Sequence, residues 1–344
     1  MNEYKLAFMG FGNVGQALGQ LLLRKREDLI KDFGIRFFVT GIATSRHGSA
    51  IDPLGIDLEQ ALELAKAGGS LNVLSAQPAP QDGVAFINAC PADVLFENTP
   101  VNYTDGQPAI SYLRAAIEHN MHAVTANKGP VVHGYRELTE LAARHGRKFY
   151  FESAVMDGAP LFSLFRATLP AARLRSLRGV LNSTTNLILA RMEDGESFDQ
   201  AVAYAQSIGI AETNPSGDID GWDAAVKVAA LVTVLMDIPL KPAQVERQGI
   251  RGITPEAVRQ AKSQGKRYKL VCAAQREGDK VVSRVAPELV GADSPLYGVQ
   301  GTSSIVTFES DVLGQLSIVE DDPGPHTTAY GLLADFINAV REVK

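Results

Sequence analysis

The sequence has few of the features that mark several protein classes. It contains only two cysteines in 344 residues, Cys90 and Cys272, and they lie far apart. Disulfide-stabilised folds and cysteine-based zinc sites need more cysteines at closer spacing. Both classes are therefore excluded, and the low cysteine content suits a reducing compartment. The longest apolar stretch, residues 226–236, is interrupted by Lys227 and is far shorter than the roughly 20 residues of a membrane span.

An excess of charge of one sign is also missing. The chain has 33 basic and 39 acidic residues, a formal net charge of −6, and no long block of like charge. This balance argues against a nucleic-acid or membrane-surface partner. The N-terminus is acidic at Glu3, and a glycine motif begins by residue 10, so a signal peptide is not expected. We expect a cytoplasmic protein of about two domains with well-packed cores, given its length and its 45% hydrophobic content.

Short apolar runs alternate with amphipathic segments over the first 150 residues. The pattern predicts strands at 5–9, 36–43, 85–89, 94–97 and 122–125, and helices at 16–27, 58–67, 110–119 and 135–145. Such alternation is typical of a parallel, doubly wound α/β sheet. We therefore predict a Rossmann-type nucleotide-binding domain over residues 1–150.

The pattern changes after residue 150. Strands are predicted at 148–151, 177–181, 269–275, 281–285, 304–308 and 315–319, and helices at 185–193, 221–236 and 327–343. This mixture indicates an α+β domain over residues 151–319. Because no flexible linker separates the two domains, we expect them to be tightly joined, with a site between them.

A glycine motif follows the first predicted strand and opens the first predicted helix. It consists of Gly10, Gly12 and Gly15, with Phe11, Asn13 and Val14 between them. In a dinucleotide-binding fold the first glycine allows the tight turn, the second lets the pyrophosphate approach the backbone, and the third lets helix and strand pack closely. The helix N-terminus then presents free N–H groups to the phosphates. The alternative is a glycine turn that binds no dinucleotide.

The end of the second predicted strand has no acidic residue for a ribose 2′-hydroxyl. Ser45 and Arg46 stand there instead, and an arginine suits the 2′-phosphate of NADP. The alternative is an arginine in a solvated loop. NADP is therefore favoured, and NAD stays open.

The stretch from Glu212 to Lys227 is the densest in chemistry-bearing residues. Pro215 and Gly217 are expected to keep Glu212 and Asp218 in a loop, and Asp218 or Asp220 to cap the helix that follows. Asp223 and Lys227 are four residues apart and lie on one helical face. Since Lys227 interrupts an apolar segment, it is either a surface side chain in a simple ion pair or a partly buried proton donor tuned by carboxylates.

Two further stretches favour a proton-transfer site. Lys128 comes just after a predicted sheet strand, on the edge where ligands bind in such folds. Residues 152–160 form a Gly/Pro-containing turn whose carbonyl groups could face a cation. Two lysines, several carboxylates and a nicotinamide pocket suit a small zwitterionic substrate with a reducible carbonyl. Cys90 has no basic surroundings that would favour a reactive thiolate, and we expect a buried structural thiol there.

Together these stretches resemble the homoserine dehydrogenase family over nearly the whole chain. The matching segments are the glycine loop, Glu97-Asn98-Thr99-Pro100, Thr125–Lys128, Glu152–Pro160, Asn182–Asn186, Glu212–Lys227 and Thr328-Ala329. The resemblance implies reversible NAD(P)H-dependent reduction of L-aspartate 4-semialdehyde to L-homoserine in threonine, methionine and isoleucine biosynthesis. It also implies a homodimer formed through the middle domain, and a last helix, from about residue 320 to 344, that returns to the nucleotide-binding domain. With 344 residues, we expect the monofunctional type without a regulatory C-terminal domain.

The resemblance also assigns roles to individual residues. Lys227 would donate a proton to the carbonyl oxygen while the nicotinamide delivers hydride, and Lys128 would line the substrate and nicotinamide pocket. Glu212, Asp218 and Asp223 would form the substrate and lysine network. The remaining residues implied are Thr99 and Gly324 for the cofactor, and the groups of Glu152, Val155, Asp157 and Ala159 for a sodium-like cation.

The sequence departs from the family pattern in three places. Ser183 and Asn214 stand where the family usually has glycine and aspartate, and Asp322-Pro323-Gly324 replaces Gly-Ala-Gly. These departures affect the backbone at 182–184, one carboxylate beside the site, and the role of Gly324. The alternatives to the family's activity are another nicotinamide-dependent oxidoreductase of a small amino acid and a catalytically silent cofactor-binding protein.

Overall fold

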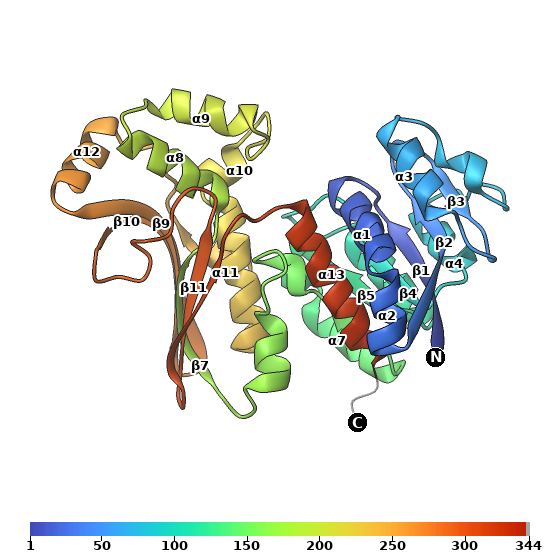
Figure 1. Ribbon diagram of the computed structural model, residues 1–344. Coiled ribbons are helices and arrows are strands. Elements are labelled where there is room, and N and C mark those ends of the chain that lie inside the picture. Colours follow the sequence, from blue (N-terminus) through green and yellow to red (C-terminus); the bar gives the residue numbers. More distant parts are fainter. Residues whose placement is uncertain (342–344) are drawn as a thin grey trace. The chain divides into compact units, whose positions relative to one another are not determined.

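The computed structural model describes residues 1–341, and these form two compact units (Figure 1). The first unit contains Met1–Pro160 together with the chain from Gly324 onward, and the second contains Leu161–Pro323. The change of pattern near residue 150 therefore falls inside the first unit. The reason is that the segment after residue 150 is held by the last helix, since the backbone N–H of Glu152 donates to Asp335 Oδ2 at 2.6 Å.

The first unit is built on a mainly parallel sheet with the order β3-β2-β1-β4-β5-β6. The strands are β1 (Asn2–Met9), β2 (Ile35–Ala43), β3 (Ser49–Ile51), β4 (Val94–Glu97), β5 (His122–Thr125) and β6 (Phe149–Tyr150). Only β3 in this list runs antiparallel to its neighbour, β2. The order and the parallel pairing confirm the Rossmann-type doubly wound class.

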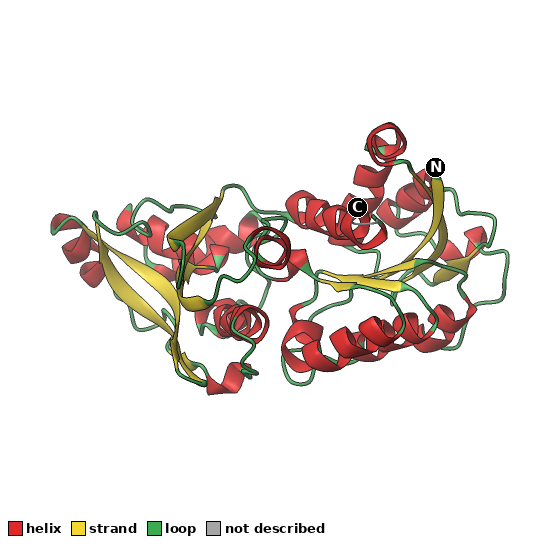
Figure 2. Cartoon of the chain, turned by 90° about the horizontal axis from the view of Figure 1, so that it is seen from below, coloured by secondary structure: helices red, strands yellow, loops and turns green. Residues whose placement is uncertain are grey.

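Helices cover both faces of this sheet, as Figure 2 shows. They are α1 (Asn13–Arg24), α2 (Arg26–Phe33), α3 (Leu58–Lys66), α4 (Gly83–Ala89), α5 (Ala109–Glu118), α6 (Lys128–His133), α7 (Tyr135–Arg144) and α13 (Pro325–Val340), with short 3₁₀ turns at Leu71–Leu74 and Glu152–Ala154. Alternate residues of β1 pack on the two faces of the sheet. Leu6 and Phe8 pack with α1 and α13, whereas Ala7 and Met9 pack with α4 and α5. The two-residue period of a strand thus supplies both cores.

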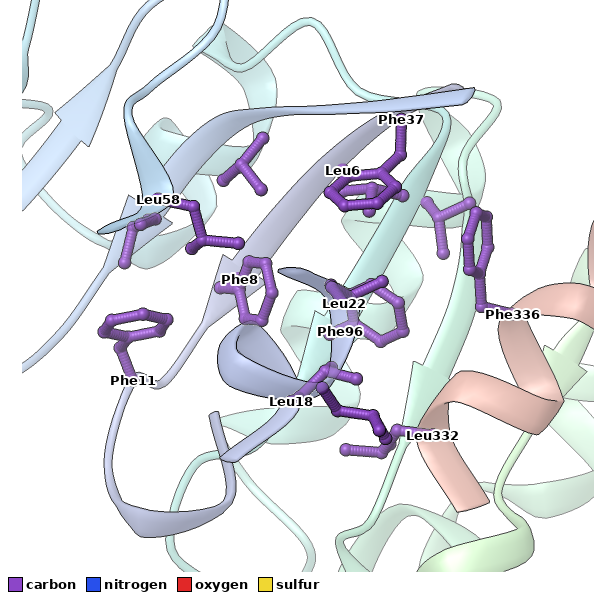
Figure 3. Packing of buried hydrophobic residues seen from close by; sticks show 14 of the residues in the cluster. Leu6, Phe8, Phe11, Leu18, Leu22, Phe37, Leu58, Phe96, Leu332 and Phe336 are labelled. Carbon is purple, nitrogen blue, oxygen red and sulfur yellow. The ribbon is translucent and has the colours of Figure 1, made fainter. Parts of the chain in front are cut away.

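The last helix is part of the core of the first unit although it is far from it in sequence. Leu332 and Phe336 of α13 lie beside Phe8 and Phe96 of the central strands (Figure 3). The Phe96 and Phe336 rings meet edge to face, with centroids 6.0 Å apart. Burial of these large apolar side chains is the main force that attaches α13 to the unit. The predicted extension of this helix to Val343 lies outside the described residues.

The second unit is built on a mostly antiparallel sheet with the order β12-β11-β7-β9-β10-β8. Its strands are β7 (Leu174–Val180), β8 (Glu246–Arg247), β9 (Lys266–Glu277), β10 (Lys280–Gly291), β11 (Ser304–Ser310) and β12 (Gly314–Glu320). Its helical segments are Leu164–Thr168 in a π turn, α8 (Ser183–Glu193), α9 (Phe198–Ser207), α10 (Ser216–Ile219), α11 (Trp222–Leu235), Pro242–Gln244 in a 3₁₀ turn, and α12 (Pro255–Ser263). Helices α8, α11 and α12 contact β9. This arrangement confirms the predicted second α+β domain.

Two predicted elements of the first unit are wrong. Residues 85–89 form part of helix α4, because Asp82 caps the helix by accepting a hydrogen bond from the N–H of Ala85 at 2.8 Å. A short apolar run does not distinguish a buried strand from a buried helix. The helix predicted at 16–27 is interrupted at Lys25, where α1 ends and α2 begins.

In residues 1–341, no helix is both long and apolar enough to cross a bilayer. The long apolar helix, α11, is instead buried within the second unit on nearly all sides. A helix that is apolar all round is typical of a protein interior as well as of a membrane.

Replacing Phe336 by alanine should lower the free energy of unfolding by about 3–5 kcal/mol, because the change leaves a cavity in the core of the first unit. The measurement is guanidinium unfolding followed by circular dichroism. Tyr330→Ala is the matched control, since Tyr330 lies on the same helix and is 57% exposed. An equal loss in both variants would show that Phe336 does not anchor α13.

Candidate active site

The ends of four neighbouring strands of the first unit are aligned. Met9 of β1 is paired with Ala43 of β2 and with Glu97 of β4, and Glu97 is paired with Thr125 of β5. β3 stands outside this alignment. The glycine loop, the Ser45-Arg46 pair, Thr99 and Lys128 all follow these strand ends within a few residues. The edge that carries them is where doubly wound folds bind nucleotides.

The glycine loop has the shape that a dinucleotide needs. Gly10 has a φ of +96°, and a Cβ there would lie 2.6 Å from the carbonyl oxygen of Asn98. A Cβ on Gly15 would lie 2.6 Å from the carbonyl oxygen of Gly10. Gly12, in contrast, has no atom within 4 Å of its Cβ position, and it caps α1 without any side-chain hydrogen bond. Space above Gly12 and uncapped N–H groups of Asn13, Val14 and Gly15 suit a pyrophosphate.

Ser45 and Arg46 lie in an exposed turn directly after β2. The turn is closed by the Thr44 hydroxyl, which accepts a hydrogen bond from the N–H of His47 at 2.7 Å, and by a backbone bond from Thr44 to Gly48. This turn places the guanidinium of Arg46 in solvent beyond the strand end. Arg46 is therefore available to a phosphate group of a bound ligand.

Thr99 and Lys128 are positioned by a buried network between β4 and β5. Glu97 is fully buried, accepts a hydrogen bond from the Thr99 N–H at 2.8 Å, and is hydrogen-bonded to the Thr125 hydroxyl at 2.7 Å. Asn127 caps α6 by accepting from the N–H of Gly129 at 2.9 Å, and its amide donates to the Thr99 carbonyl at 3.2 Å. Lys128 is the first residue of α6 and is half-buried. The two turns that carry Thr99 and Lys128 are thus tied to each other.

The loop at residues 152–159 is bound to α13. Ser153 donates a hydrogen bond from its hydroxyl to the Thr328 carbonyl at 2.7 Å, and Asp157 Oδ2 accepts from the Gly324 N–H at 2.6 Å and the Thr327 hydroxyl at 2.8 Å. Asp157 has a φ of +36°, so the chain turns sharply there. Because the Asp157 carboxylate is hydrogen-bonded to the start of α13, a cation at this loop would depend on backbone carbonyls such as those of Val155 and Ala159. Across residues 1–341, no cluster of three or more His, Cys, Asp or Glu side chains could hold a metal ion.

Gly324 is the residue that precedes α13. Its φ of 178° is extended backbone that any residue adopts, and a Cβ there would make only ordinary contact with the His326 ring. The backbone therefore does not require glycine at this position. What Gly324 contributes here is its N–H, which is held by Asp157 and by the Thr327 hydroxyl at 2.8 Å.

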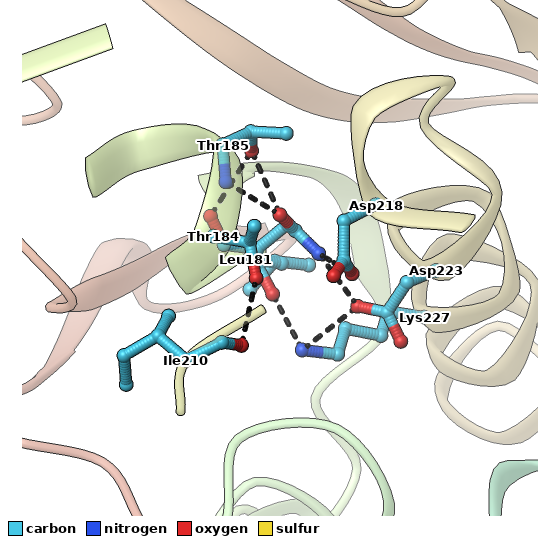
Figure 4. A network of polar contacts seen from close by, with 8 residues as sticks. Leu181, Thr184, Thr185, Ile210, Asp218, Asp223 and Lys227 are labelled. Carbon is cyan, nitrogen blue, oxygen red and sulfur yellow. Dashed lines mark hydrogen bonds and ion pairs between the residues drawn. The ribbon is translucent and has the colours of Figure 1, made fainter. Parts of the chain in front are cut away.

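The second unit contains a lysine–carboxylate cluster on α11 (Figure 4). Lys227 Nζ donates to the carbonyl oxygen of Leu181 at 2.5 Å and lies 3.3 Å from Asp223 Oδ2. The side chains of Lys227 and Asp223 are only 15% and 11% exposed. The alternative of a solvated surface ion pair therefore does not describe this lysine. An ammonium has three donors, and these two contacts leave one for another acceptor.

Asn182 joins the two aspartates of the cluster, a role that was not predicted from the sequence. Its amide donates to Asp218 Oδ1 at 2.7 Å and to Asp223 Oδ2 at 3.1 Å, while its oxygen caps α8 by accepting from the Thr185 N–H at 2.9 Å. Burial, followed by the negative charge of Asp223, raises the pKa of Asp218, and the Asn182 hydrogen bond opposes that rise. The available signals were its place in the Asn182–Asn186 segment that resembles the family and its position just before the helix predicted at 185–193.

Two expectations about the Glu212–Lys227 stretch are wrong. Asp218 lies within the short helix α10 rather than in a loop. The helix α11 is preceded by Gly221 in a left-handed conformation, φ +80°, without a side-chain cap, so neither aspartate caps it. Glu212 is exposed before α10, and its carbonyl accepts a hydrogen bond from Gln206 at 3.2 Å.

The departures at Ser183 and Asn214 have local explanations. Ser183 is the first residue of α8, where the helical conformation makes no demand for glycine. Asn214 accepts hydrogen bonds from the N–H and the hydroxyl of Ser216, at 3.2 and 2.7 Å, and so supports the start of α10. An asparagine oxygen makes this turn as well as a carboxylate would.

Both cysteines are buried free thiols. Burial raises the pKa of Cys90 to about 11 and that of Cys272 to about 12. Neither thiol is therefore a thiolate at neutral pH, and a cysteine nucleophile has no support in this fold.

The predicted site residues fall into two groups, one in each unit. The glycine loop, Ser45, Arg46, Thr99, Lys128, the 152–159 loop and Gly324 belong to the first unit, and Glu212, Asp218, Asp223 and Lys227 belong to the second. The first unit has the strand edge at which doubly wound folds bind dinucleotides, and the second has a largely buried lysine–aspartate pair. Together these two features define the class of protein. The protein is a nicotinamide-dependent oxidoreductase that acts on a CH–OH group.

Comparison with known proteins places the chain within that class. The family model for homoserine dehydrogenase matches residues 160–337, and the model for the NAD-binding domain of homoserine dehydrogenase matches residues 10–152. The chain belongs to the homoserine dehydrogenase family, whose members interconvert L-aspartate 4-semialdehyde and L-homoserine. The resemblance seen in the sequence is thereby confirmed.

Individual relatives are similar over nearly their whole length. An NAD(+)-dependent homoserine dehydrogenase of Pseudomonas canavaninivorans is 34% identical over 98% of this chain and 96% of its own. A homoserine dehydrogenase of Methanocaldococcus jannaschii is 36% identical over 98% and 99%. The solved structure of a hyperthermophilic archaeal homoserine dehydrogenase in complex with NADPH has a TM-score of 0.83 and 27% identity, and the match covers 98% of both chains.

Gly12→Ala should weaken NADPH binding by about tenfold or more, equivalent to about 1.4 kcal/mol, because the new methyl group enters the space above the helix N-terminus. The thermal midpoint of the cofactor-free protein should stay nearly unchanged, since no protein atom lies within 4 Å of that methyl position. Fluorescence titration measures the first quantity and circular dichroism the second. Gly252→Ala, equally open, is the control. Unaltered NADPH affinity in Gly12→Ala would contradict the assignment.

Proposed function

We propose that this chain reduces L-aspartate 4-semialdehyde reversibly to L-homoserine, with Lys227 as the proton donor. The observation that carries the proposal is the partly buried Lys227 ammonium, which has one hydrogen-bond donor left after its contacts with Leu181 and Asp223. When bound, the nicotinamide supplies the hydride that is added to the aldehyde carbon. Lys227 then transfers a proton to the carbonyl oxygen, which completes the CH–OH group.

Asp223 supports this role by fixing the position of the lysine head group, because its Oδ2 lies 3.3 Å from Lys227 Nζ. The hydrogen bond to the Leu181 carbonyl fixes the orientation of the ammonium group, and this also fixes the direction of its remaining N–H. In the oxidation direction, Lys227 in its neutral form would accept the hydroxyl proton of homoserine.

The substrate's amino group is assigned to the carboxylates of the second unit. Glu212, Asp218 and Asp223 provide negative charge suited to an α-ammonium group, and Lys128 supplies positive charge from the first unit. The first unit thus serves as the cofactor-binding domain and the second as the substrate-binding domain. The reaction requires that cofactor and substrate meet during turnover.

We propose NADP as the preferred cofactor, bound through the glycine loop, Ser45 and Arg46, with Thr99, Lys128 and Gly324 at its nicotinamide end. Support comes from the exposed Arg46 guanidinium and from the absence of an acidic residue in the turn 44–48. One relative is named an NAD(+)-dependent homoserine dehydrogenase, and another was solved in complex with NADPH.

A sodium-like cation is proposed at the 152–159 loop, held by groups of Glu152, Val155, Asp157 and Ala159. The attachment of this loop to α13 by Ser153 and Asp157 gives it the rigidity that a backbone-ligand site needs. A rise of thermal stability in NaCl that is not reproduced by tetramethylammonium chloride would support the cation. Equal midpoints of thermal unfolding in the two salts would contradict the proposed cation site.

A homodimer formed through the second unit is also proposed. Val282 of β10 and Val319 of β12 are each 54% exposed, which leaves apolar surface on that sheet. Sedimentation should give twice the chain mass, and Val282→Asp should weaken the association.

A cytoplasmic location is proposed as well, because the thiols of Cys90 and Cys272 are free.

The decisive assay follows NADPH oxidation with aspartate semialdehyde, with pyruvate and oxaloacetate as comparison substrates. Turnover of the semialdehyde alone supports the proposal. Turnover of another carbonyl compound instead would indicate a different amino-acid oxidoreductase. No turnover under any salt condition, with intact NADPH binding, would indicate a silent cofactor-binding protein.

Lys227→Ala should reduce kcat by about 10²–10⁴-fold or abolish turnover, because the proton donor is removed. NADPH affinity should stay within about threefold, since Lys227 belongs to the second unit and the glycine loop to the first. Stopped-flow rates and fluorescence titration give the two values. Lys241→Ala is the control, an exposed lysine of the same unit. A comparable loss of NADPH binding would show that the role is misassigned.

Arg46→Ala should weaken NADP binding by about 10- to 100-fold, the loss expected for hydrogen bonds to a charged phosphate, and NAD binding far less. Comparative titration with NADPH and NADH measures this. Arg144→Ala, an exposed arginine at the end of α7, should change neither. Parallel losses for both cofactors would remove the 2′-phosphate argument.

A further inference from the structure

Glu97 is a titratable group that the proposed mechanism does not use. It is the last residue of β4, it is fully buried, and it lies between Met9 of β1 and Thr125 of β5. A carboxylate in such a place needs strong compensation, because removing an ionised group from water is costly. The hydrogen bonds to its side chain come from the hydroxyl and backbone N–H of Thr99, the hydroxyl of Thr125 and the side chain of Asn127, and all of these groups are neutral.

The hydrogen-bond count around Thr125 indicates where a proton must be. The Thr125 hydroxyl lies 2.7 Å from Glu97 Oε2 and 3.0 Å from the Glu97 carbonyl oxygen, and it accepts from the Asn127 N–H at 2.9 Å. A hydroxyl has one proton and two lone pairs. If Glu97 were ionised, that single proton could serve only one of the two oxygens, and the other would face a lone pair.

A protonated Glu97 satisfies all three contacts of the Thr125 hydroxyl. Oε2–H then donates to the Thr125 oxygen, the Thr125 proton goes to the Glu97 carbonyl, and the second lone pair of Thr125 accepts from Asn127. Oε1 acts as the acid's carbonyl oxygen and accepts from the N–H and the hydroxyl of Thr99. A carbonyl oxygen has two lone pairs, so both donors are accommodated.

The charge environment agrees with this count. Burial is the largest influence and raises the pKa of Glu97, while hydrogen bonds from Thr99, Thr125 and Asn127 only partly oppose it. On α5, which packs against β4, the titratable neighbour is Tyr112, whose own pKa is raised mainly by burial. Lys128 begins α6, just beyond β5.

We propose that Glu97 is a neutral carboxylic acid and a positioning residue. Its proton completes a series of hydrogen bonds from Glu97 through Thr125 to Asn127, and this series holds the two turns that carry Thr99 and Lys128. One oxygen fixes Thr99, the other fixes Thr125, and Asn127 then ties the start of α6 to the Thr99 carbonyl. Being fully buried, Glu97 does not touch substrate. The cofactor contacts of Thr99 and Lys128 rest on the proposed function, whereas the protonation of Glu97 does not.

The protonation state is tested by infrared spectroscopy of the cofactor-free protein at pH 8. The carbonyl band of an un-ionised carboxyl group should be present, should shift in D₂O, and should shift again when only glutamate is labelled with ¹³C. Labelling of glutamate separates Glu97 from the buried aspartates such as Asp218. The band should vanish in Glu97→Gln and persist in Glu118→Gln, the exposed glutamate at the end of α5. Absence of such a band in the unmodified protein overturns the proposal, whatever the enzyme's activity.

The positioning role is tested by three substitutions at the same place. Glu97→Gln should keep kcat, KM and NADPH affinity within about threefold and leave the pH–rate profile unchanged, because an amide reproduces the neutral acid's donor and acceptor. Glu97→Ala and Glu97→Asp should lower kcat/KM by about 100-fold, since the turns lose their common support. Thr125→Ser should retain activity and Thr125→Val should lose it. A Glu97→Gln variant as impaired as Glu97→Ala, or with a shifted pH profile, would show that the charge of Glu97 is needed.

Discussion

The alignment of four strand ends is the constraint on which the cofactor side of the molecule depends. Parallel pairing places Ala43, Met9, Glu97 and Thr125 at one edge, so each following turn begins at the same level. Packing on both faces maintains that alignment, because β1 sends alternate residues to two separate cores. α13 contributes to one of these cores and also secures the 152–159 loop. Hydrophobic packing therefore aligns the strand ends, and hydrogen bonds then position the residues of the turns that follow them.

The second unit depends on a different constraint, which is to give a lysine polar partners in a largely apolar environment. Helix α11 is buried almost all round, and its lysine is stabilised by one carboxylate and one backbone carbonyl. Asn182 joins Asp223 to Asp218, because its amide group donates a hydrogen bond to each of the two carboxyl groups. A network in which nearly every polar group has a partner rigidifies a site and sets the direction of its remaining donor.

Local patterns predicted much of the fold, and they failed where a short segment was compatible with more than one structure. The parallel sheet and the glycine loop follow from strand periodicity and residue type, and so does the shared face of Asp223 and Lys227. Residues 85–89 were misassigned because five apolar residues fit either a strand or a helix until the Asp82 cap is seen. Asp218 was expected in a loop because Pro215 and Gly217 disfavour longer helices but allow the single turn of α10.

Short motifs and local periods encode the family, the doubly wound class and the residue types of the site, so all three can be predicted from the sequence. The groups that those residues contact follow from the tertiary structure. The Leu181 carbonyl that holds Lys227 lies 46 positions away, and Thr125 lies 28 positions from Glu97. Desolvation and hydrogen-bond satisfaction depend on such distant neighbours, so neither the burial of Lys227 nor the confinement of Glu97 could be known before the chain was folded.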